Sequence, residues 1–242
     1  MNRLADYNLT FVKVVIIGYK LHVGCNHRTV INSDTSGRHH KASGHYHDIF
    51  TYAFPTLANQ EKAQRLLTES GIDEIWRHNG CRVNLIGSLR MGLLASHRDI
   101  DLHVYSKGIT EESGFAIVAQ IDKIPGITEM KCINGLHTDE HCVAWHLFYK
   151  HEGEIWQIDV IHIDEGTQYD GCFERMADRI LEVITPSQKE IILRLKFETP
   201  DGKDYHGVEY YEAVIAEGIA NMNDFEKWVV EHRKKQMYYW IP

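Results

Sequence analysis

The chain lacks any apolar run long enough to cross a membrane. Its longest such stretch, residues 11–19, is interrupted by Lys13, whereas a membrane-spanning helix needs about 20 apolar residues. No small-x-small cleavage site follows this stretch, which argues against a secretory signal peptide. These absences predict a cytoplasmic protein that does not associate with a membrane.

Cysteine is scarce as well, and the five cysteines present form no Cys-x-x-Cys pair. An odd number without that spacing is typical of reduced thiols in a cytoplasmic protein, not of a disulfide framework. One set of metal-ligand residue types, Cys132, His137, His141 and Cys142, lacks the tighter spacing of known zinc knuckles. We expect a strand–loop–strand there, with ordinary histidines, in preference to a zinc site.

A surplus of basic charge is also missing, since 26 Lys and Arg stand against 34 Asp and Glu, for a net charge of −8. A protein that binds nucleic acid over a broad surface normally carries a basic face. We therefore expect no stable nucleic-acid platform, although a nucleic acid held through metal ions stays open as a substrate. With 242 residues, 43% of them hydrophobic, the chain can form one large or two modest domains.

What the sequence does contain is one region with a clear chemical pattern. Residues 83–86 read as an apolar strand before a Gly-Ser turn, and residues 99–102 (Asp-Ile-Asp-Leu) lie on a second strand. Side chains alternate faces along a strand, so Asp99 and Asp101 point the same way, with Cβ atoms about 6.5–7 Å apart. That separation suits carboxylates that converge on a pair of divalent ions.

The turn before this acidic strand is suited to an anion. Gly87 lets a ligand approach the backbone closely, and Ser88 opens a short helix. The serine hydroxyl and the free N–H groups at the start of that helix can hold a phosphate. A phosphate site beside an acidic metal site indicates chemistry on a nucleoside triphosphate.

Taken together, these motifs resemble the polymerase beta-like nucleotidyltransferase superfamily, in the form of a bacterial minimal-core enzyme with a C-terminal helical region. The apolar-Gly-Ser turn, a spacer of ten residues and the Asp-x-Asp strand carry the resemblance. Residues 87–92 (GSLRMG) also match the family's turn, with its Arg and second Gly. The family's third carboxylate, on a later strand between hydrophobic residues, matches Asp159 in residues 158–160.

The resemblance implies an α+β protein with the nucleotidyltransferase fold, a mixed β-sheet flanked by helices, and a C-terminal helical domain. The implied catalytic and metal-binding residues are Asp99, Asp101 and Asp159, and the implied nucleotide-binding residues are Gly87, Ser88 and Arg90. Two Mg²⁺ ions, or Mn²⁺ in their place, would assist the transfer of NMP from an NTP such as ATP to a hydroxyl acceptor, with release of pyrophosphate. The acceptor, a small molecule or a macromolecule, and the base of the NTP are left open.

Three other interpretations of the same residues remain. The acids could be surface residues on an edge strand beside an ordinary turn. The protein could be a catalytically inactive module of the same fold, with a regulatory or antitoxin-like binding role, because a fold does not determine a function. A Mg²⁺-dependent phosphohydrolase could use the same acids, and it would release phosphate without an acceptor.

The charge and hydropathy patterns divide the chain into three parts. Residues 1–55 have six basic and three acidic residues, a local charge of +3, and predict a poorly ordered or loosely attached extension. Residues 56–166 are predicted to form the nucleotidyltransferase core, and residues 167–242 the helical domain. In the extension, His39, His40, His45 and His47 could bind a transition metal or could be part of a His-rich tail.

Hydrophobic periodicity places the elements of the core. Helices are expected over 57–71, 90–95 and from Thr110 to about 124, and strands over 83–86, 100–105, 127–133, 142–149 and 155–163. In the third helix, Phe115 and Val118 are expected to face the core. Asp159 and Asp164 are five positions apart, so on one strand their side chains face opposite sides of the sheet. We expect Asp159, inside the strand, to join the site and Asp164, at its end, to cap the following turn.

The C-terminal part reads as helical. Residues 185–188 (Thr-Pro-Ser-Gln) form a capping box that starts a helix ending near Phe197, and two more helices are expected over 208–217 and, after an Asn223 cap, over 224–236. Residues there that could contact the triphosphate or the base, or could be solvated charges, are Lys189, Arg194, Lys196, Tyr205 and His206. His103 shares a face with Asp101, but we expect it to be a hydrogen-bonded spectator.

Overall fold

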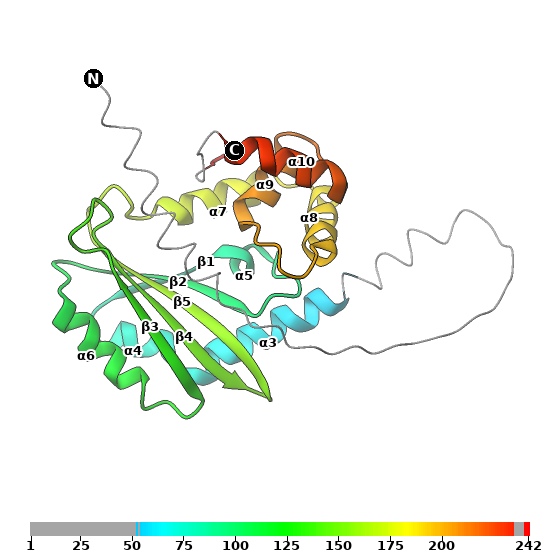
Figure 1. Cartoon of the computed structure of the whole chain (residues 1–242). Coiled ribbons are helices and arrows are strands. Elements are labelled where there is room, and N and C mark those ends of the chain that lie inside the picture. Colours follow the sequence, from blue (N-terminus) through cyan, green and yellow to red (C-terminus); the bar gives the residue numbers. More distant parts are fainter. Residues whose placement is uncertain (1–51, 53, 235–239) are drawn as a thin grey trace, which may run out of the picture.

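A five-stranded mixed sheet with the order β1-β2-β5-β4-β3 is the central element of the fold (Figure 1). The structure is a computed structural model and describes residues 52, 54–234 and 240–242. The predicted N-terminal extension, with its histidine cluster, therefore lies outside the described residues except for positions 52, 54 and 55. The strands are β1 (Arg82–Ile86), β2 (Asp99–Ser106), β3 (Ile127–Asn134), β4 (Cys142–His151) and β5 (Glu154–Asp164).

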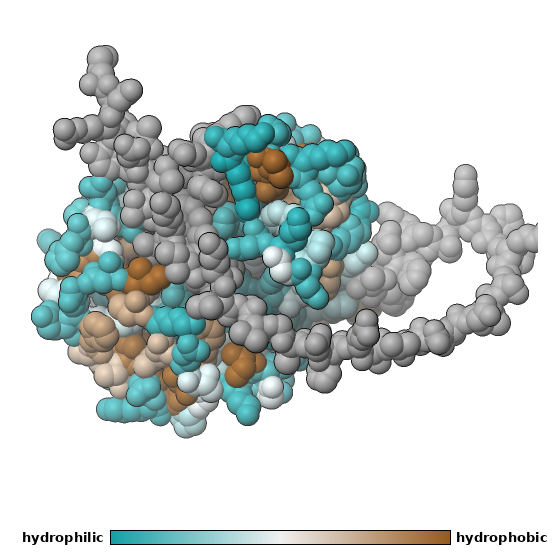
Figure 2. Space-filling model, in the orientation of Figure 1, coloured by the Kyte–Doolittle hydropathy of each residue, from teal (hydrophilic) through white to brown (hydrophobic). Residues whose placement is uncertain are grey.

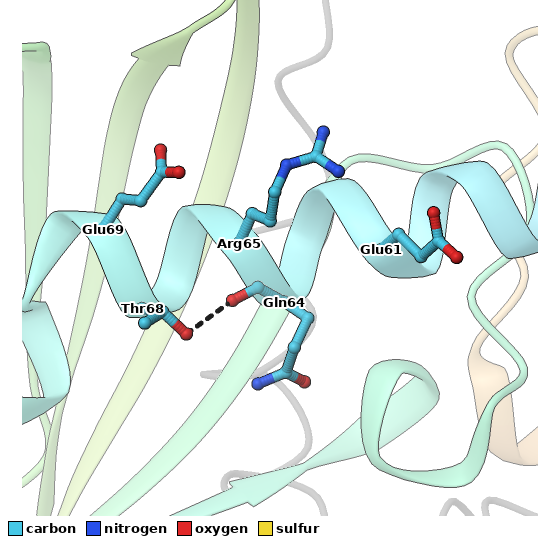
Figure 3. A pocket seen from close by; sticks show the side chains of 5 residues that line it. All are labelled: Glu61, Gln64, Arg65, Thr68 and Glu69. Atoms are coloured by element: carbon cyan, nitrogen blue, oxygen red, sulfur yellow. Dashed lines mark hydrogen bonds between the residues drawn. The ribbon is translucent and has the colours of Figure 1, made fainter.

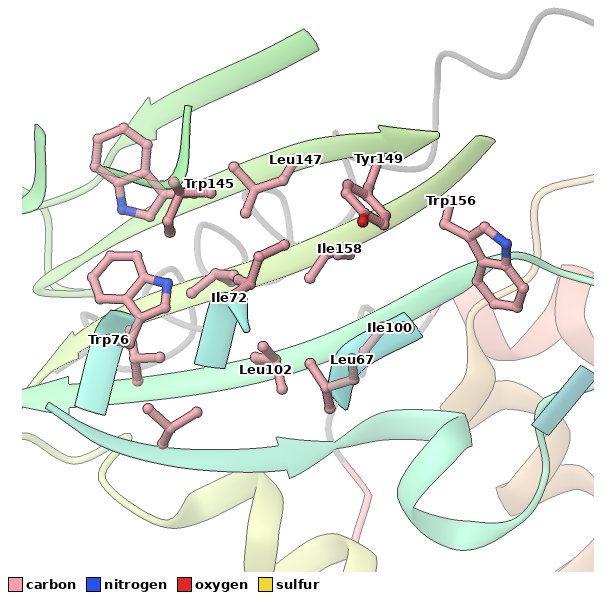
Figure 4. Close-up of a cluster of buried hydrophobic side chains, with 14 of the residues drawn as sticks. Leu67, Ile72, Trp76, Ile100, Leu102, Trp145, Leu147, Tyr149, Trp156 and Ile158 are labelled. Carbon is pink, nitrogen blue, oxygen red and sulfur yellow. The ribbon is translucent and has the colours of Figure 1, made fainter. Parts of the chain in front are cut away.

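One face of the sheet is apolar and carries the main core. Ile100, Leu102 and Val104 alternate along β2, and they pack with the helices α3 (Phe54–Ser70), α4 (Ile72–His78) and α6 (Glu111–Ile121). Figure 4 shows three tryptophans in this cluster, and the side chains of Trp76, Trp145 and Trp156 are almost completely buried. Burial of a large apolar side chain stabilises a protein by about 1.5–3 kcal/mol, so this face anchors the sheet.

The opposite face of the sheet meets α7 (Cys172–Val183) along β1 and the short helix α5 (Gly87–Met91). Acids spaced four residues apart, on α7 and just before it, meet donors on β1 and α5: the pairs are Arg82–Asp170, Asn84–Glu174 and Arg90–Asp178. The hydroxyl of Tyr105 on β2 also donates to Glu174, over 2.7 Å. This row of polar contacts fastens α7 to the edge of the sheet.

A second apolar cluster joins α7 to α8 (Pro186–Glu198), α9 (Gly207–Ile215) and α10 (Met222–Arg233). The segment formed by α5 and the residues after it contributes to this cluster as well, through Met91, Leu93 and Ala95. In the same segment Leu89 and Leu94 belong to the core of the sheet. Residues 89–95 are therefore shared by the two apolar clusters.

The surface differs between the two ends of the molecule. On the face visible in Figure 2, hydrophobic residues gather mainly over the sheet, while the helical end formed by α7–α10 is mostly hydrophilic.

None of the helices within the described ranges is long and apolar enough to cross a bilayer.

The predicted α+β fold with a mixed sheet and C-terminal helices is confirmed, and the five strands lie within two residues of their predicted bounds. The capping box at Thr185 is also present, with the Gln188 N–H donating to the Thr185 hydroxyl over 3.2 Å.

Three local predictions are wrong. The short helix expected at 90–95 spans Gly87–Met91, because Gly92 takes a left-handed φ of 68° that ends it. The last helix is capped by Asn221 and not by Asn223, since the Asn221 side chain accepts the Asp224 N–H. Phe115 is 55% exposed, because Ile117 and Val118 take the core-facing positions of α6.

Candidate active site

Asp101 and Asp159 are direct neighbours across the parallel pair β2–β5. Paired residues on adjacent strands point to the same face of a sheet, and the strands lie about 4.8 Å apart. Asp99, two residues before Asp101, shares that face and pairs with Gln157. The register thus brings the three predicted carboxylates to one face of two adjacent strands.

The surroundings of Asp99 and Asp101 disfavour their charged forms. Burial raises the pKa of both carboxyl groups, and the neighbouring charges of Asp99 and Asp159 raise the pKa of Asp101 further. The Oδ1 atom of Asp99 is buried and accepts no hydrogen bond from any described residue. A cation placed beside these groups would lower their pKa values and favour the charged forms.

The turn between β1 and α5 is shaped around Asp101. Gly87 has a φ of 67°, a left-handed value that a side chain disfavours. A Cβ at this position would lie only 1.9 Å from the Oδ2 atom of Asp101. Glycine was expected here for the approach of a ligand, but in this structure it is the carboxylate of Asp101 that occupies the space.

Ser88 is buried and bonded to the C-terminal helices. Its hydroxyl accepts a hydrogen bond from the Lys196 ammonium over 2.7 Å and lies 3.1 Å from the hydroxyl of Tyr211. The ammonium also donates to the Leu93 carbonyl, over 3.1 Å. The positive charge of Lys196 lowers the pKa of Asp99, against the larger effect of burial. Lys196 therefore places one buried cation between the turn and the carboxylates.

Asp159 is held by two neighbours. Its Oδ1 accepts hydrogen bonds from His146 Nδ1 over 2.6 Å and from Gln157 Nε2 over 2.8 Å, and its Oδ2 lies 3.0 Å from the same Gln157 nitrogen. His146 pairs with Asp159 across β4–β5. Neither partner was identified from the sequence, because only the register of the strands reveals that they share a face with Asp159.

A cleft lies between the sheet and the C-terminal helices, next to Asp99 and Lys196. Its lining residues are Ser88, Leu94, Ala95, His97, Asp99, Lys196, Thr199, Lys203, Asp204, Tyr205, Gly207 and Tyr210. Of the five C-terminal candidates from the sequence, Lys196 and Tyr205 line this cleft. The Arg194 guanidinium instead donates to the Ala220 carbonyl.

Figure 3 shows a second, shallow depression, lined by Glu61, Gln64, Arg65, Thr68 and Glu69. All five side chains come from the single helix α3, and the Thr68 hydroxyl donates to the Gln64 carbonyl over 2.9 Å. None of the predicted site residues lines it, so the cleft beside Asp99 is the candidate site.

Arg90 and His103 lie apart from the cleft lining. The Arg90 guanidinium donates to the Leu85 carbonyl over 3.2 Å and pairs with Asp178 on α7. His103 is buried, with Nδ1 3.3 Å from the Tyr105 hydroxyl, and burial lowers its pKa to about 4. His103 thus makes the hydrogen bond expected of a spectator. Of the predicted site residues, Ser88 and Asp99 line the cleft, whereas Gly87, Arg90, Asp101 and Asp159 do not.

The side chains of the described residues do not by themselves form a complete metal site around the carboxylates. Within the described part of the chain, no three His, Cys, Asp or Glu side chains are grouped so that they alone could hold a metal ion. This applies equally to Cys132, His137, His141 and Cys142. Any ion at the site therefore needs ligands from water or substrate in addition to the protein.

Neither a protein-family profile nor a curated protein sequence matches the chain. Solved structures do match over part of their length. Cid1 poly(U) polymerase bound to MgGTP is 14% identical, with a TM-score of 0.48, and the match covers 65% of this chain and 49% of that one.

Two further structures give similar values. The non-canonical poly(A) polymerase complex GLD-2–GLD-3 is 12% identical with a TM-score of 0.46, and the match covers 64% of this chain and 52% of that one. The polymerase core of TRAMP is 18% identical with a TM-score of 0.46, over 63% and 48% of the two chains. These neighbours are nucleotidyltransferases, and the chain spans about half the length of each. At such low identities and scores, the activity has to be inferred from the side chains of the cleft.

Proposed function

We propose that the protein is a Mg²⁺-dependent nucleotidyltransferase that transfers NMP from an NTP to a hydroxyl acceptor and releases pyrophosphate. The observation that carries the proposal is the register of β2 and β5, which sets Asp101 beside Asp159, with Asp99 on the same face. The cleft beside Asp99 also contains Ser88 and Lys196, which are suited to a triphosphate. Residues 56–166 would supply the carboxylates, and residues 167–242 would close the cleft.

The donor set fits Mg²⁺. This ion commonly binds one or two carboxylates and completes its octahedron with water and substrate phosphates. Asp99 and Asp101 supply two carboxylates with raised pKa values, and the Oδ1 of Asp99 has no hydrogen-bond donor among the described residues. Asp159 would add a ligand for a second ion through the oxygen that His146 does not bind. When bound, the ions neutralise phosphate charge and make the acceptor hydroxyl more acidic.

The residues of the chain would bind and orient the substrates. The Ser88 hydroxyl and the N–H groups after Gly87 would bind the β- and γ-phosphates, and Lys196 would add positive charge beside them. Arg90 would join them only by exchanging Asp178 for a phosphate, because Asp178 now binds its guanidinium. The acceptor oxygen then attacks the α-phosphate, the bond to pyrophosphate breaks, and the hydroxyl proton passes to Asp159 or to water.

The test is release of pyrophosphate from a panel of NTPs, with Mg²⁺ and candidate acceptors, followed by mass spectrometry of the products formed in cell extract. Asp101→Asn should abolish turnover while the protein stays folded, because it removes a metal ligand without adding volume. Asp164→Asn is the matched control. It lies at the end of β5, where its side chain accepts the Gly108 N–H over 2.7 Å, so turnover should persist.

The same assay separates the competing functions. Full activity of Asp101→Asn would refute the assignment of the carboxylates. Nucleotide binding without any pyrophosphate release would favour an inactive regulatory or antitoxin-like module. Release of phosphate in the absence of an acceptor would indicate a phosphohydrolase.

A further inference from the structure

We infer that His146 and Gln157 are positioning residues that fix the orientation of Asp159 for metal binding, an inference that rests on the proposed function. His146 lies on β4 and Gln157 on β5, so the two donors reach Asp159 from two neighbouring strands. Metal-binding carboxylates are commonly oriented by hydrogen bonds from groups that do not touch the ion. The two side chains would give Asp159 that orientation.

The contact between His146 and Asp159 is short and shielded. The two atoms lie 2.6 Å apart, and the side chains are only 2% and 8% exposed. A carboxylate oxygen accepts, so the His146 Nδ1 carries the proton of this bond. In a site excluded from water such a bond is stronger than one at the surface, and it holds the carboxylate in one rotamer.

The two donors also divide the roles of the carboxylate oxygens. Oδ1 receives both His146 Nδ1 and Gln157 Nε2, which use its two lone pairs. Among the residues that the structure describes, Oδ2 has only the longer contact to Gln157, at 3.0 Å. One lone pair of Oδ2 is thus left for an ion, so Asp159 would bind through a single oxygen.

The His146 side chain makes no other hydrogen bond to a described residue that would explain its presence. Its Nε2 is buried and has no partner among the described residues. A buried polar atom without a partner costs about 1–3 kcal/mol, so stability alone gives little reason for a histidine here. A role in orienting Asp159 accounts for the residue.

The test is a titration of the full-length protein with Mn²⁺, followed by electron paramagnetic resonance of the free ion. His146→Leu keeps the volume but removes the donor, and Gln157→Met does the same at the second position. Each should weaken Mn²⁺ binding 10–100-fold, the range seen when such a hydrogen bond to a ligand is lost. His146→Asn should retain binding within a few fold, because its amide nitrogen can replace Nδ1.

His162→Leu is the matched control. His162 is also buried on β5, but it faces the other side of the sheet, where Nε2 lies 2.7 Å from the Ser106 hydroxyl. Its replacement should leave Mn²⁺ binding unchanged. A folded His146→Leu variant that binds Mn²⁺ like the unchanged protein would overturn the inference. If His146→Leu does not fold, unchanged binding by Gln157→Met would overturn it.

Failure of the proposed function would give a different experimental result from failure of the positioning role alone. If the unchanged protein neither binds Mn²⁺ nor releases pyrophosphate, the metal-dependent enzyme itself is refuted. If it does both, and the His146 and Gln157 variants bind Mn²⁺ as well as it does, only the positioning role is refuted.

Discussion

The carboxylate of Asp101 occupies the space that a side chain at Gly87 would need. The two positions are neighbours through β1 and β2, where Ile86 pairs with Asp101. A Cβ at residue 87 would lie 1.9 Å from Asp101 Oδ2, a distance at which one of the two groups has to move. The glycine of the turn and the acid of the next strand thus depend on each other.

Replacement of Gly87 by alanine should therefore abolish activity and lower stability. The left-handed backbone alone costs an alanine about 1–2 kcal/mol, and the clash with Asp101 adds to that cost. Gly108→Ala is the matched control, because Gly108 has the same φ of 67° and no atom within 4 Å of its Cβ position. Thermal melting and pyrophosphate release measure both effects. Equal loss of activity in the two variants would contradict the role of the Gly87–Asp101 contact.

Lys196→Met should raise the KM for the NTP about 10-fold and lower the melting temperature. Hydrogen bonds to charged groups contribute about 1.5–3 kcal/mol each, and the Lys196 ammonium makes them to the Ser88 hydroxyl and the Leu93 carbonyl. Arg194→Met, at a partly exposed residue on the same helix α8, should change KM little. Steady-state kinetics with varied NTP measures the difference. An unchanged KM in Lys196→Met would remove the lysine from the triphosphate site.

Arg90 could bind the nucleotide, or it could only hold α7 in place through its ion pair with Asp178. The two roles predict different effects of mutation. If Arg90 mainly fastens α7, then Arg90→Ala and Asp178→Ala should lower stability by similar amounts. The loss of stability in the double variant should differ from the sum of the two single losses, but by less than about 1 kcal/mol, as is usual for ion pairs near the surface. Denaturant unfolding of the two single variants and the double variant measures this coupling. A rise in the KM for the NTP in Arg90→Ala but not in Asp178→Ala would instead support the nucleotide-binding role expected from the sequence.

Glu140 makes stability depend on pH near neutrality. Burial and, to a smaller extent, the neighbouring charge of Asp139 raise its pKa from 4.5 to about 7. A raised pKa in the folded state means that stability is fully present below pH 4.5 and declines as pH rises through about 7. Glu140→Gln keeps the shape without the charge, so between pH 4.5 and about 7 its melting temperature should fall less than that of the unchanged protein. Parallel declines in the two proteins would contradict this assignment.

Sequence patterns located most of the fold because they depend on local physics. The alternation of side chains along a strand places Asp99 and Asp101 on one face of β2. The same rule places Asp159 and Asp164, five positions apart, on opposite faces of β5. The capping box at Thr185 marked the start of α8. Each of these depends on residues close together in the chain.

The contacts between distant segments could not be predicted in this way. The register of β4 against β5 decides that His146 reaches Asp159, and no local pattern encodes a register between strands. Among the three basic residues of α8, Lys196 turns inward to Ser88 while Arg194 binds the Ala220 carbonyl, a choice set by the packing of α8 on α9. Arg90 meets Asp178 because α7 packs against α5.

Residues 89–95 belong to two apolar clusters at once. Leu89 and Leu94 are part of the cluster that packs on the sheet, and Met91, Leu93 and Ala95 are part of the cluster among the C-terminal helices. A truncation at the predicted boundary after residue 166 would remove the helices that cover Met91, Leu93 and Ala95. These apolar side chains would then be exposed to water beside the acidic site. We therefore expect residues 56–166 and residues 167–242 to unfold together, in one cooperative step, on heating.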